Sequence, residues 1–288
     1  MIKKDTFLAK LHELYADQSK HSIYQNIPAF VRDALGYTET INERWRGDTT
    51  RWEYMQNYID FSNQSVLDVG ANTGFFTLSL AHEYPDSIFT ALEGNTNHAE
   101  FIRLVAAQFG LKNVRILTQY LDFATIDSLG QYDTILLYNV LHHAGVDFDN
   151  NLVLSEGDLF NYLVRYMTKI REHSSRIVYQ MGYNWGGNKH HPIVALQDDA
   201  GKYVYTCRFL RNAGWYIEAI AAPYGREGDI PVSHKNLPED VIAAANSCDE
   251  GILRSRLSQL FDPGIDTFSE FYRRPIFICT QLSGESNL

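Results

Sequence analysis

The sequence predicts an α/β protein with a doubly wound, mostly parallel sheet of seven strands. The segment 65–81 reads as a buried strand, a glycine turn and a helix in direct succession. Short apolar runs and amphipathic helices then alternate as far as residue 222, which is typical of parallel sheets covered on both faces. With 288 residues, of which 45% are hydrophobic, the chain can bury one large core.

The first strand and helix of this sheet are the most clearly marked. Residues 65–69 are mainly apolar and β-branched, and Asp68 is the charge that a buried strand carries only for a reason. Gly70 and Gly74 allow a tight turn and a close approach of a ligand to the backbone. The apolar run 75–81 continues as a helix.

The other elements divide the chain into a helical cap or lid over residues 1–60 and a main domain over residues 61–288. The cap contains a helix at 6–15 and a second helix that begins at Pro28. The main domain carries an insertion at 223–273, before the last strand. In order, we expect strand 87–92, helix 97–109, strand 113–118, strand 132–138, helix 151–172, strand 176–181, helix 203–212, strand 216–221, helices 238–246 and 251–261, and strand 275–281.

The residues around the glycine turn predict which ligand it holds. A dinucleotide site has three glycines, but here Asn72 replaces the middle one and no basic residue stands nearby, so phosphate is not favoured. Glu93 ends the next strand, 25 residues after Asp68, where a carboxylate can accept both hydroxyls of a ribose. The ligand is therefore an adenosine without a diphosphate, unless the turn is merely a tight connection.

This stretch resembles motif I and the acidic loop of the class I S-adenosylmethionine (SAM) methyltransferases, which have a Rossmann-like sheet. The resemblance implies SAM as cofactor and a last strand that inserts antiparallel between the fifth and sixth. It also implies that Asp122, after the third strand, lies beside the adenine amino group. The cofactor-binding residues implied so far are Asp68, Gly70, Asn72, Gly74, Glu93 and Asp122.

In the same family, the loop after the fourth strand lines the methyl donor and the acceptor. Here that loop is Asn139-Val-Leu-His-His143, so Asn139 is a further cofactor candidate. His142 and His143 lie at the carboxyl edge of the sheet, and a histidine that titrates near neutrality can deprotonate a hydroxyl acceptor. Either histidine is a catalytic candidate, or one of them hydrogen-bonds the backbone and shapes the loop.

A second, partial resemblance links the chain to the tRNA wobble-uridine methyltransferase and carboxymethyltransferase family. It rests on the segment 43–52, with its two tryptophans, and loosely on the ending Tyr272-Arg-Arg-Pro. It implies that Trp45 lies against the cofactor and that Arg274 closes the site from the C-terminus. The lysine that this family uses for a carboxylated cofactor falls on Thr50, which favours ordinary SAM.

The loop after the fifth strand is the candidate acceptor site. It mixes aromatic residues, amides and glycines, which suits stacking and hydrogen bonding to a sugar-like or heteroaromatic acceptor, although a plain surface loop has the same composition. No spaced ligand motif supports a metal at its histidines. The candidate substrate-binding residues are Tyr183, Asn184, Trp185, His190 and Arg274.

The composition limits location and partners. A net charge of −10 and a pI near 5.4 disfavour a broad nucleic-acid surface, but a local basic patch leaves tRNA open. Three cysteines without a CxxC pair indicate neither a disulfide framework nor zinc, and so a cytoplasmic protein. The sequence shows neither a leader nor an apolar run of about 18 residues, so we expect a soluble protein without a membrane segment. The oligomeric state leaves no signal.

The combined prediction is a SAM-dependent methyltransferase that O-methylates a hydroxyl of a small-molecule or glycan acceptor. One alternative is a tRNA wobble-uridine modifying enzyme, which the tryptophan segment favours and the acidity opposes. Another is a non-catalytic SAM-binding regulatory subunit.

Overall fold

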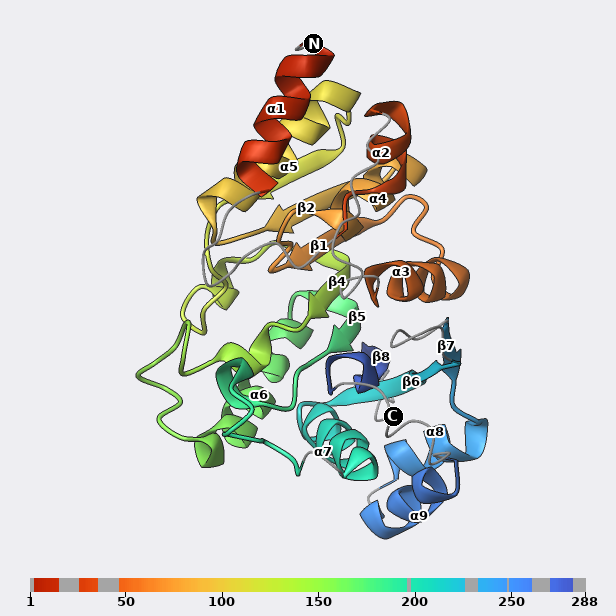
Figure 1. The fold of residues 1–288 in the computed structure, drawn as a ribbon. Helices are drawn as coiled ribbons and strands as arrows, with labels where there is room; N and C mark the ends of the chain where they lie inside the picture. The colour runs from red at the N-terminus through yellow and green to blue at the C-terminus, as the bar shows by residue number, and fades with distance from the viewer. Residues whose placement is uncertain are drawn as a thin grey trace, which may run out of the picture. The chain divides into compact units, whose positions relative to one another are not determined.

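The computed structural model describes residues 3–15, 26–35, 47–195, 198–225, 233–247, 249–260 and 270–281. The chain forms two compact units, Met1–Leu121 and Asp122–Leu288 (Figure 1). Among the described residues, no helix has the length and apolar character needed to span a membrane.

The first unit contains three parallel strands in the order β3-β2-β1. They are β1 (Ser65–Val69), β2 (Ile88–Leu92) and β3 (Val114–Leu117). Val69 at the end of β1 is in register with Leu92 at the end of β2. The carboxyl ends of these strands therefore meet at one edge, where parallel α/β sheets bind their ligands.

Helices of the first unit bury one apolar cluster against this sheet. The helices are α1 (Lys4–Tyr15), α2 (Ala29–Leu35), α3 (Gly47–Tyr58), α4 (Phe75–Glu83) and α5 (Thr96–Phe109). The cluster draws on α1, α2, α4 and α5, and α1 lies along α5 (Figure 1). The described part of the predicted cap thus shares its core with the cofactor-motif helices. The boundary at residue 60 stays a prediction. The cluster consists of Phe7, Leu11, Ile27, Val31, Ala71, Leu78, Ala91, Phe101, Ile102, Leu104, Val105 and Ala106.

The second unit contains five strands in the order β4-β5-β8-β6-β7. They are β4 (Tyr132–Tyr138), β5 (Ser174–Gln180), β6 (Trp215–Tyr224), β7 (Ser233–Asn236) and β8 (Ile276–Gln281). β4 and β5 are parallel, and β8 lies antiparallel between β5 and β6 as predicted. The edge strand β7 brings the described strands to eight rather than seven. Its short polar sequence, Ser-His-Lys-Asn, lacks the apolar alternation that marks a strand.

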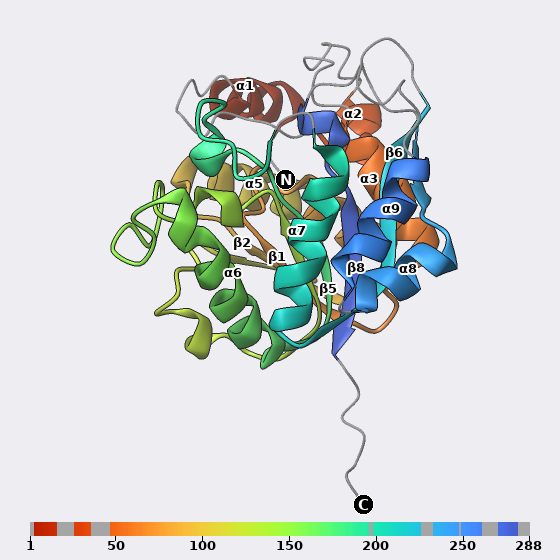
Figure 2. The ribbon, with the colours of Figure 1, turned by 90° about the horizontal axis from the view of Figure 1, so that it is seen from below.

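Four helices pack around the strands of the second unit. They are α6 (Glu156–Arg171), α7 (Asp199–Asn212), α8 (Glu239–Asn246) and α9 (Glu250–Leu260). Figure 2 shows α6 beside α7, with α9 on the other side of α7. The indole Nε1 of Trp215, at the start of β6, donates to the Met167 carbonyl of α6 over 3.0 Å. The α/β class with a mostly parallel sheet and a helical insertion is therefore confirmed.

Two predicted helix starts are wrong for the same reason. We expected α6 from residue 151 and α7 from residue 203, because both estimates followed apolar periodicity alone. α6 instead begins after Ser155, whose hydroxyl donates to Asp158 over 2.9 Å. α7 begins after Asp198, which accepts from the Gly201 amide over 2.8 Å. Asp198 thus caps α7 through its side chain, whereas Ser155 bonds the Asp158 side chain and makes no capping bond to the helix backbone.

Candidate functional site

The turn after β1 needs glycine and asparagine because its backbone is left-handed. φ is 68° at Gly70, 50° at Asn72 and 77° at Gly74. A Cβ at Gly74 would lie 2.7 Å from Cγ1 of Ile102, so helix packing also excludes a side chain there. Asparagine tolerates this backbone region better than most residues, which accounts for the variant motif.

Glu93 fixes this turn to the end of β2. One carboxylate oxygen, Oε2, accepts the Asn72 amide over 2.7 Å, and Oε1 accepts the Asn95 amide over the same distance. The residue is 8% exposed. A carboxylate oxygen can accept more than one hydrogen bond, so Glu93 can hold the turn and still accept hydroxyl groups from a ligand.

Asp68 connects β1 to the first turn of α4. Its Oδ2 accepts the Thr77 hydroxyl over 2.7 Å, and the residue is 4% exposed. Burial, and to a smaller extent the charge of Glu93, raise the pKa of the Asp68 carboxyl to about 6. The contact gives the buried charge a positioning role, and its predicted contact with a cofactor stays a prediction.

Two polar sites near the cofactor motifs were only partly anticipated. A Cβ on Gly94 would lie 2.5 Å from Cζ of Tyr120, whose ring is half exposed, so a side chain at position 94 would displace this ring. No motif in the sequence pointed to Tyr120. Asp122, expected beside adenine, accepts both the amide and the hydroxyl of Thr125 at 2.9 Å through Oδ1.

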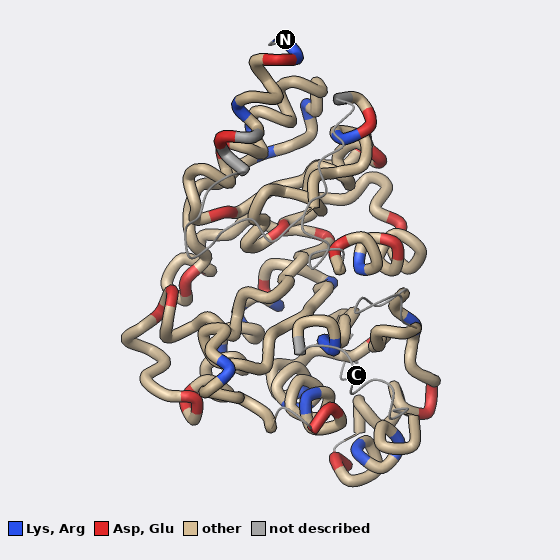
Figure 3. The backbone as a smooth tube through the Cα atoms, viewed as in Figure 1, with Lys and Arg blue, Asp and Glu red and all other residues tan. Residues whose placement is uncertain are grey.

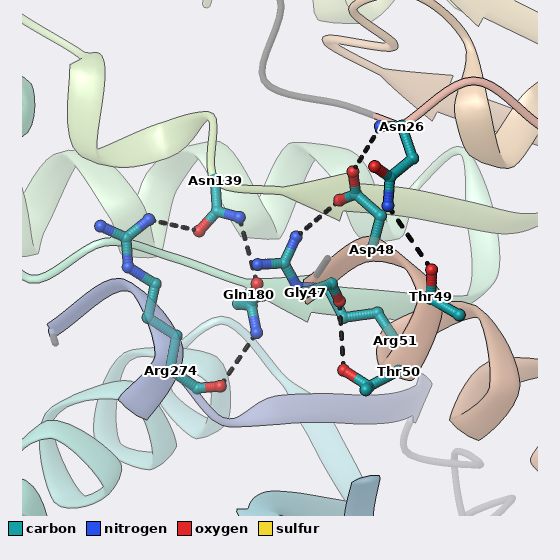
Figure 4. A network of polar contacts seen from close by, with 9 residues as sticks. All are labelled: Asn26, Gly47, Asp48, Thr49, Thr50, Arg51, Asn139, Gln180 and Arg274. Carbon is teal, nitrogen blue, oxygen red and sulfur yellow. Dashed lines mark hydrogen bonds and ion pairs between the residues drawn. The ribbon is translucent and has the colours of Figure 1, made fainter. Parts of the chain in front are cut away.

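The first turn of α3 holds a buried ion pair. Asp48 accepts the Asn26 amide over 3.0 Å, and its other oxygen lies 3.1 Å from Nη1 of Arg51 (Figure 4). Burial raises the pKa of the Asp48 carboxyl to about 6, against the opposing effect of Arg51. The Thr50 hydroxyl donates to the Gly47 carbonyl. Trp45, the expected cofactor contact, lies outside the described residues.

The ring of His142 is buried and hydrogen-bonds the backbone. It is 3% exposed, and its Nδ1 accepts the Gly182 amide over 3.3 Å. Burial, the neighbouring His143 and Arg274 hold its pKa well below the ordinary histidine value. The neutral ring that results carries its proton on Nε2, and is therefore a hydrogen-bond donor there.

His143, by contrast, is partly exposed and faces a carboxylate. Its Nδ1 lies 2.7 Å from Oδ2 of Asp147, and its side chain is 29% exposed. The ring centroids of His142 and His143 are 4.1 Å apart. Both residues belong to one 3-10 turn, Leu141–His143, which comes after β4.

A closed network joins the end of β4 to the C-terminal segment (Figure 4). Nδ2 of Asn139 donates to Oε1 of Gln180 over 3.1 Å, and Nε2 of Gln180 donates to the Arg274 carbonyl over 2.9 Å. Nη1 of Arg274 returns to Oδ1 of Asn139 over 2.8 Å. The structure therefore brings Asn139 and Arg274 together, and adds Gln180, which the sequence reading missed at the polar end of a buried strand.

The predicted substrate residues after β5 differ in burial: Tyr183 and Asn184 are buried, Trp185 is half-buried and His190 is exposed. Nε1 of Trp185 donates to the Ala144 carbonyl over 2.7 Å, which places it next to the histidine segment. Tyr183 is buried and shares a hydrogen bond with the Thr206 hydroxyl, so it supports the loop. Asn184 is buried with Oδ1 unpartnered in the described structure, and His190 is exposed. The described residues contain no group of three side chains suited to a metal.

Comparisons with known proteins agree with this geometry. The family model described as rRNA small subunit methyltransferase G matches residues 50–177. The Syntrophomonas wolfei protein "Ribosomal RNA small subunit methyltransferase G" is 28% identical over 96 residues, which cover 29% of this chain and 45% of that protein. The range of the family model includes the glycine turn, Glu93 and the strands β1 to β4. These matches support a class I SAM-dependent methyltransferase.

A second relative is also a methyltransferase, and one solved structure shares the fold. The (S)-coclaurine N-methyltransferase of Thalictrum flavum is 34% identical over 79 residues, covering 27% of this chain and 21% of that enzyme. The crystal structure of WbdD superposes with a TM-score of 0.50 at 14% identity, over 94% of this chain and 46% of that chain. The chain thus spans less than half the length of each of these three proteins. SAM, the methyl donor of the class, is confirmed as the implied cofactor.

The raised pKa of Asp68 predicts a pH-dependent stability. Because the pKa of Asp68 is about 6 in the folded state, above the ordinary 3.8, its contribution to stability is fully present below about pH 4 and is lost as pH rises through 6. A shift of about two units corresponds to about 3 kcal/mol. We expect Asp68→Asn to flatten this fall, measured by urea unfolding across that interval.

The matched control is Asp86→Asn, which changes an exposed carboxylate of the same unit. It should leave the slope unchanged. Asp48, which has a similar shift, should account for part of the remaining slope. An Asp68→Asn profile that parallels the wild-type profile would show that Asp68 does not carry the penalty.

Proposed function

We propose that this class I methyltransferase transfers a methyl group from SAM to a hydroxyl of a small-molecule or glycan acceptor. The observation that carries the proposal is the left-handed turn Gly70–Gly74, held by one oxygen of Glu93, whose other oxygen holds the Asn95 amide at the start of α5. That arrangement suits an uncharged nucleoside better than a phosphate, since a carboxylate dominates it.

The backbone of Gly70, Asn72 and Gly74 would face the amino-acid end of SAM. The remaining lone pairs of Glu93 would accept the two ribose hydroxyls. Asp122, whose Oδ1 is engaged by Thr125, would use its second oxygen for the adenine amino group. Trp45 and Asn139 complete the set as proposed cofactor contacts, and Asp68 supports the turn from behind.

The acceptor side of the reaction needs a base. The sulfonium of SAM is already a strong electrophile, so the protein chiefly aligns the acceptor for in-line attack. A hydroxyl must also lose its proton, and the partly exposed His143 is the suited group. His142 would donate a hydrogen bond from Nε2. Asn184, Trp185, His190 and Arg274 would contact the acceptor, while Tyr183 supports their loop.

Glu93→Ala should weaken SAM binding by at least tenfold, or about 1–3 kcal/mol, because charge-assisted hydrogen bonds to the ligand and to the turn are lost. Calorimetric titration of SAM measures this directly. The control, Glu100→Ala, removes a carboxylate on α5 whose side chain is 41% exposed. Equal affinity in wild type and Glu93→Ala would contradict the assigned cofactor site.

An RNA acceptor is the second candidate, because one family model and one relative carry the name of an rRNA methyltransferase. Charge argues against it. The net charge is −10, and along the described chain Lys and Arg are interspersed with Asp and Glu rather than gathered in one stripe (Figure 3). Position 50 holds threonine rather than the lysine of the wobble-uridine enzymes.

Transfer of labelled methyl groups from SAM separates the candidates. We expect label in the small-molecule or glycan fraction of a cell extract, as a base-stable methyl ether, and none in added tRNA or rRNA. Label in RNA digests, together with RNA binding that weakens steeply as the salt concentration rises, would favour the RNA acceptor over the hydroxyl acceptor. SAM binding without transfer to any fraction would favour the regulatory subunit.

The remaining features of the proposal concern location and organisation. Cys207 and Cys279 are buried free thiols, and burial raises the pKa of Cys207 to about 12, which suits the reducing cytoplasm that we propose. Residues 1–60 would form a cap, and the insertion 223–273 would contribute to acceptor specificity.

A further inference from the structure

The loop after the two histidines folds back onto His143. The amides of Val146 and Asp147 both donate to the His143 carbonyl, over 3.0 and 2.9 Å. Gly145 has φ of 83°, and its amide donates to the Phe148 carbonyl over 2.7 Å. This one-turn loop returns the Asp147 carboxylate to the ring of His143.

Packing on both sides fixes the loop. A Cβ on Gly145 would lie 2.4 Å from the Val153 carbonyl oxygen, so no other residue fits there. A Cβ on Gly186 would lie 2.7 Å from Cγ2 of Val146, and the Trp185 indole holds the Ala144 carbonyl. Contacts at Gly145, Gly186 and Trp185 thus fix the loop that carries Asp147.

The contact between the two side chains is shielded from water. Nδ1 of His143 and Oδ2 of Asp147 are both buried atoms, 2.7 Å apart, although their alignment is bent away from an ideal hydrogen bond. The His143 side chain is nevertheless 29% exposed, through atoms other than Nδ1. Catalytic hydrogen bonds are often poorly aligned before the substrate binds.

We propose that Asp147 is the positioning residue that holds His143 in the Nδ1–H tautomer, which leaves Nε2 as the general base. The inference rests on the proposed methyl transfer and specifies its acceptor as a hydroxyl group. Asp147 lies outside the residues that the sequence suggested as catalytic, because its spacing from His143 becomes meaningful only once the Gly145 turn is known.

The proposed step moves one methyl group and one proton. The acceptor oxygen attacks the methyl carbon of SAM, the O–CH3 bond forms, and the C–S bond breaks to leave neutral S-adenosylhomocysteine. The hydroxyl proton passes to Nε2 of His143, so the positive charge of the sulfonium reappears on the imidazolium. Asp147 then stabilises that imidazolium at Nδ1.

The neighbouring histidines should therefore carry opposite tautomers. His142 accepts the Gly182 amide at Nδ1 and so holds its proton on Nε2, while His143 holds its proton on Nδ1. Two-bond 15N–1H spectra of histidine-labelled protein distinguish these forms in weakly alkaline solution. His142→Gln and His143→Gln variants assign the signals.

We expect the Nδ1–H form of His143 in the wild type, and Asp147→Asn to reduce that form in favour of Nε2–H. Asp127→Asn, an exposed carboxylate of the same unit, is the control and should leave the spectrum unchanged. An Nε2–H form of His143 in the wild type, or a tautomer that ignores Asp147→Asn, would overturn the inference. The wild-type spectrum suffices if the variant does not fold.

SAM titration of the same samples keeps the two proposals apart. Asp147→Asn should bind SAM within about twofold of wild type, since a positioning residue of the base acts on the acceptor proton. Absence of SAM binding by the wild type would refute the proposed function, while the tautomers would still decide the role of Asp147.

Discussion

The candidate cofactor site depends on the Glu93 carboxylate, which holds two backbone amides from opposite sides. Through Asn72 it fixes the turn after β1, and through Asn95 it fixes the start of α5, where the Asn95 side chain in turn caps the helix. One buried anion therefore orders both segments that a nucleoside would contact. Asp68 adds a second link, because its contact with Thr77 ties α4 to β1. The left-handed residues are tolerated because these bonds over-determine the turn.

Local chemistry explains why much of this could be predicted from the sequence. Glycines at positions 70 and 74 and an acidic residue at the end of the next strand act over short chain distances, so their pattern survives in one dimension. The antiparallel last strand followed only from the family resemblance, since periodicity does not reveal strand order. The strand β7 was missed because pairing with β6, rather than its own side chains, makes it a strand.

The acceptor side could be predicted only in part, because its contacts join distant parts of the chain. Arg274 reaches Asn139 across 135 residues, and Gln180 completes their network. The sequence pattern does not distinguish His142 from His143. In the structure, His142 accepts a hydrogen bond from the Gly182 amide, and His143 faces the Asp147 carboxylate. Identical side chains thus acquire different chemistry from the backbone around them. Tyr183, grouped with the substrate residues, is buried and bonds Thr206, and its contact with the acceptor stays a prediction.

The measurement that tests the central claim most directly is mass spectrometry of the small molecules released when the purified protein is denatured. The account predicts SAM or S-adenosylhomocysteine, in amounts that approach one per chain after incubation with SAM. A carboxylated analogue would favour the wobble-uridine reading instead. Release of neither compound, even after incubation with excess SAM, would contradict the assignment of the Glu93-anchored turn as a cofactor site.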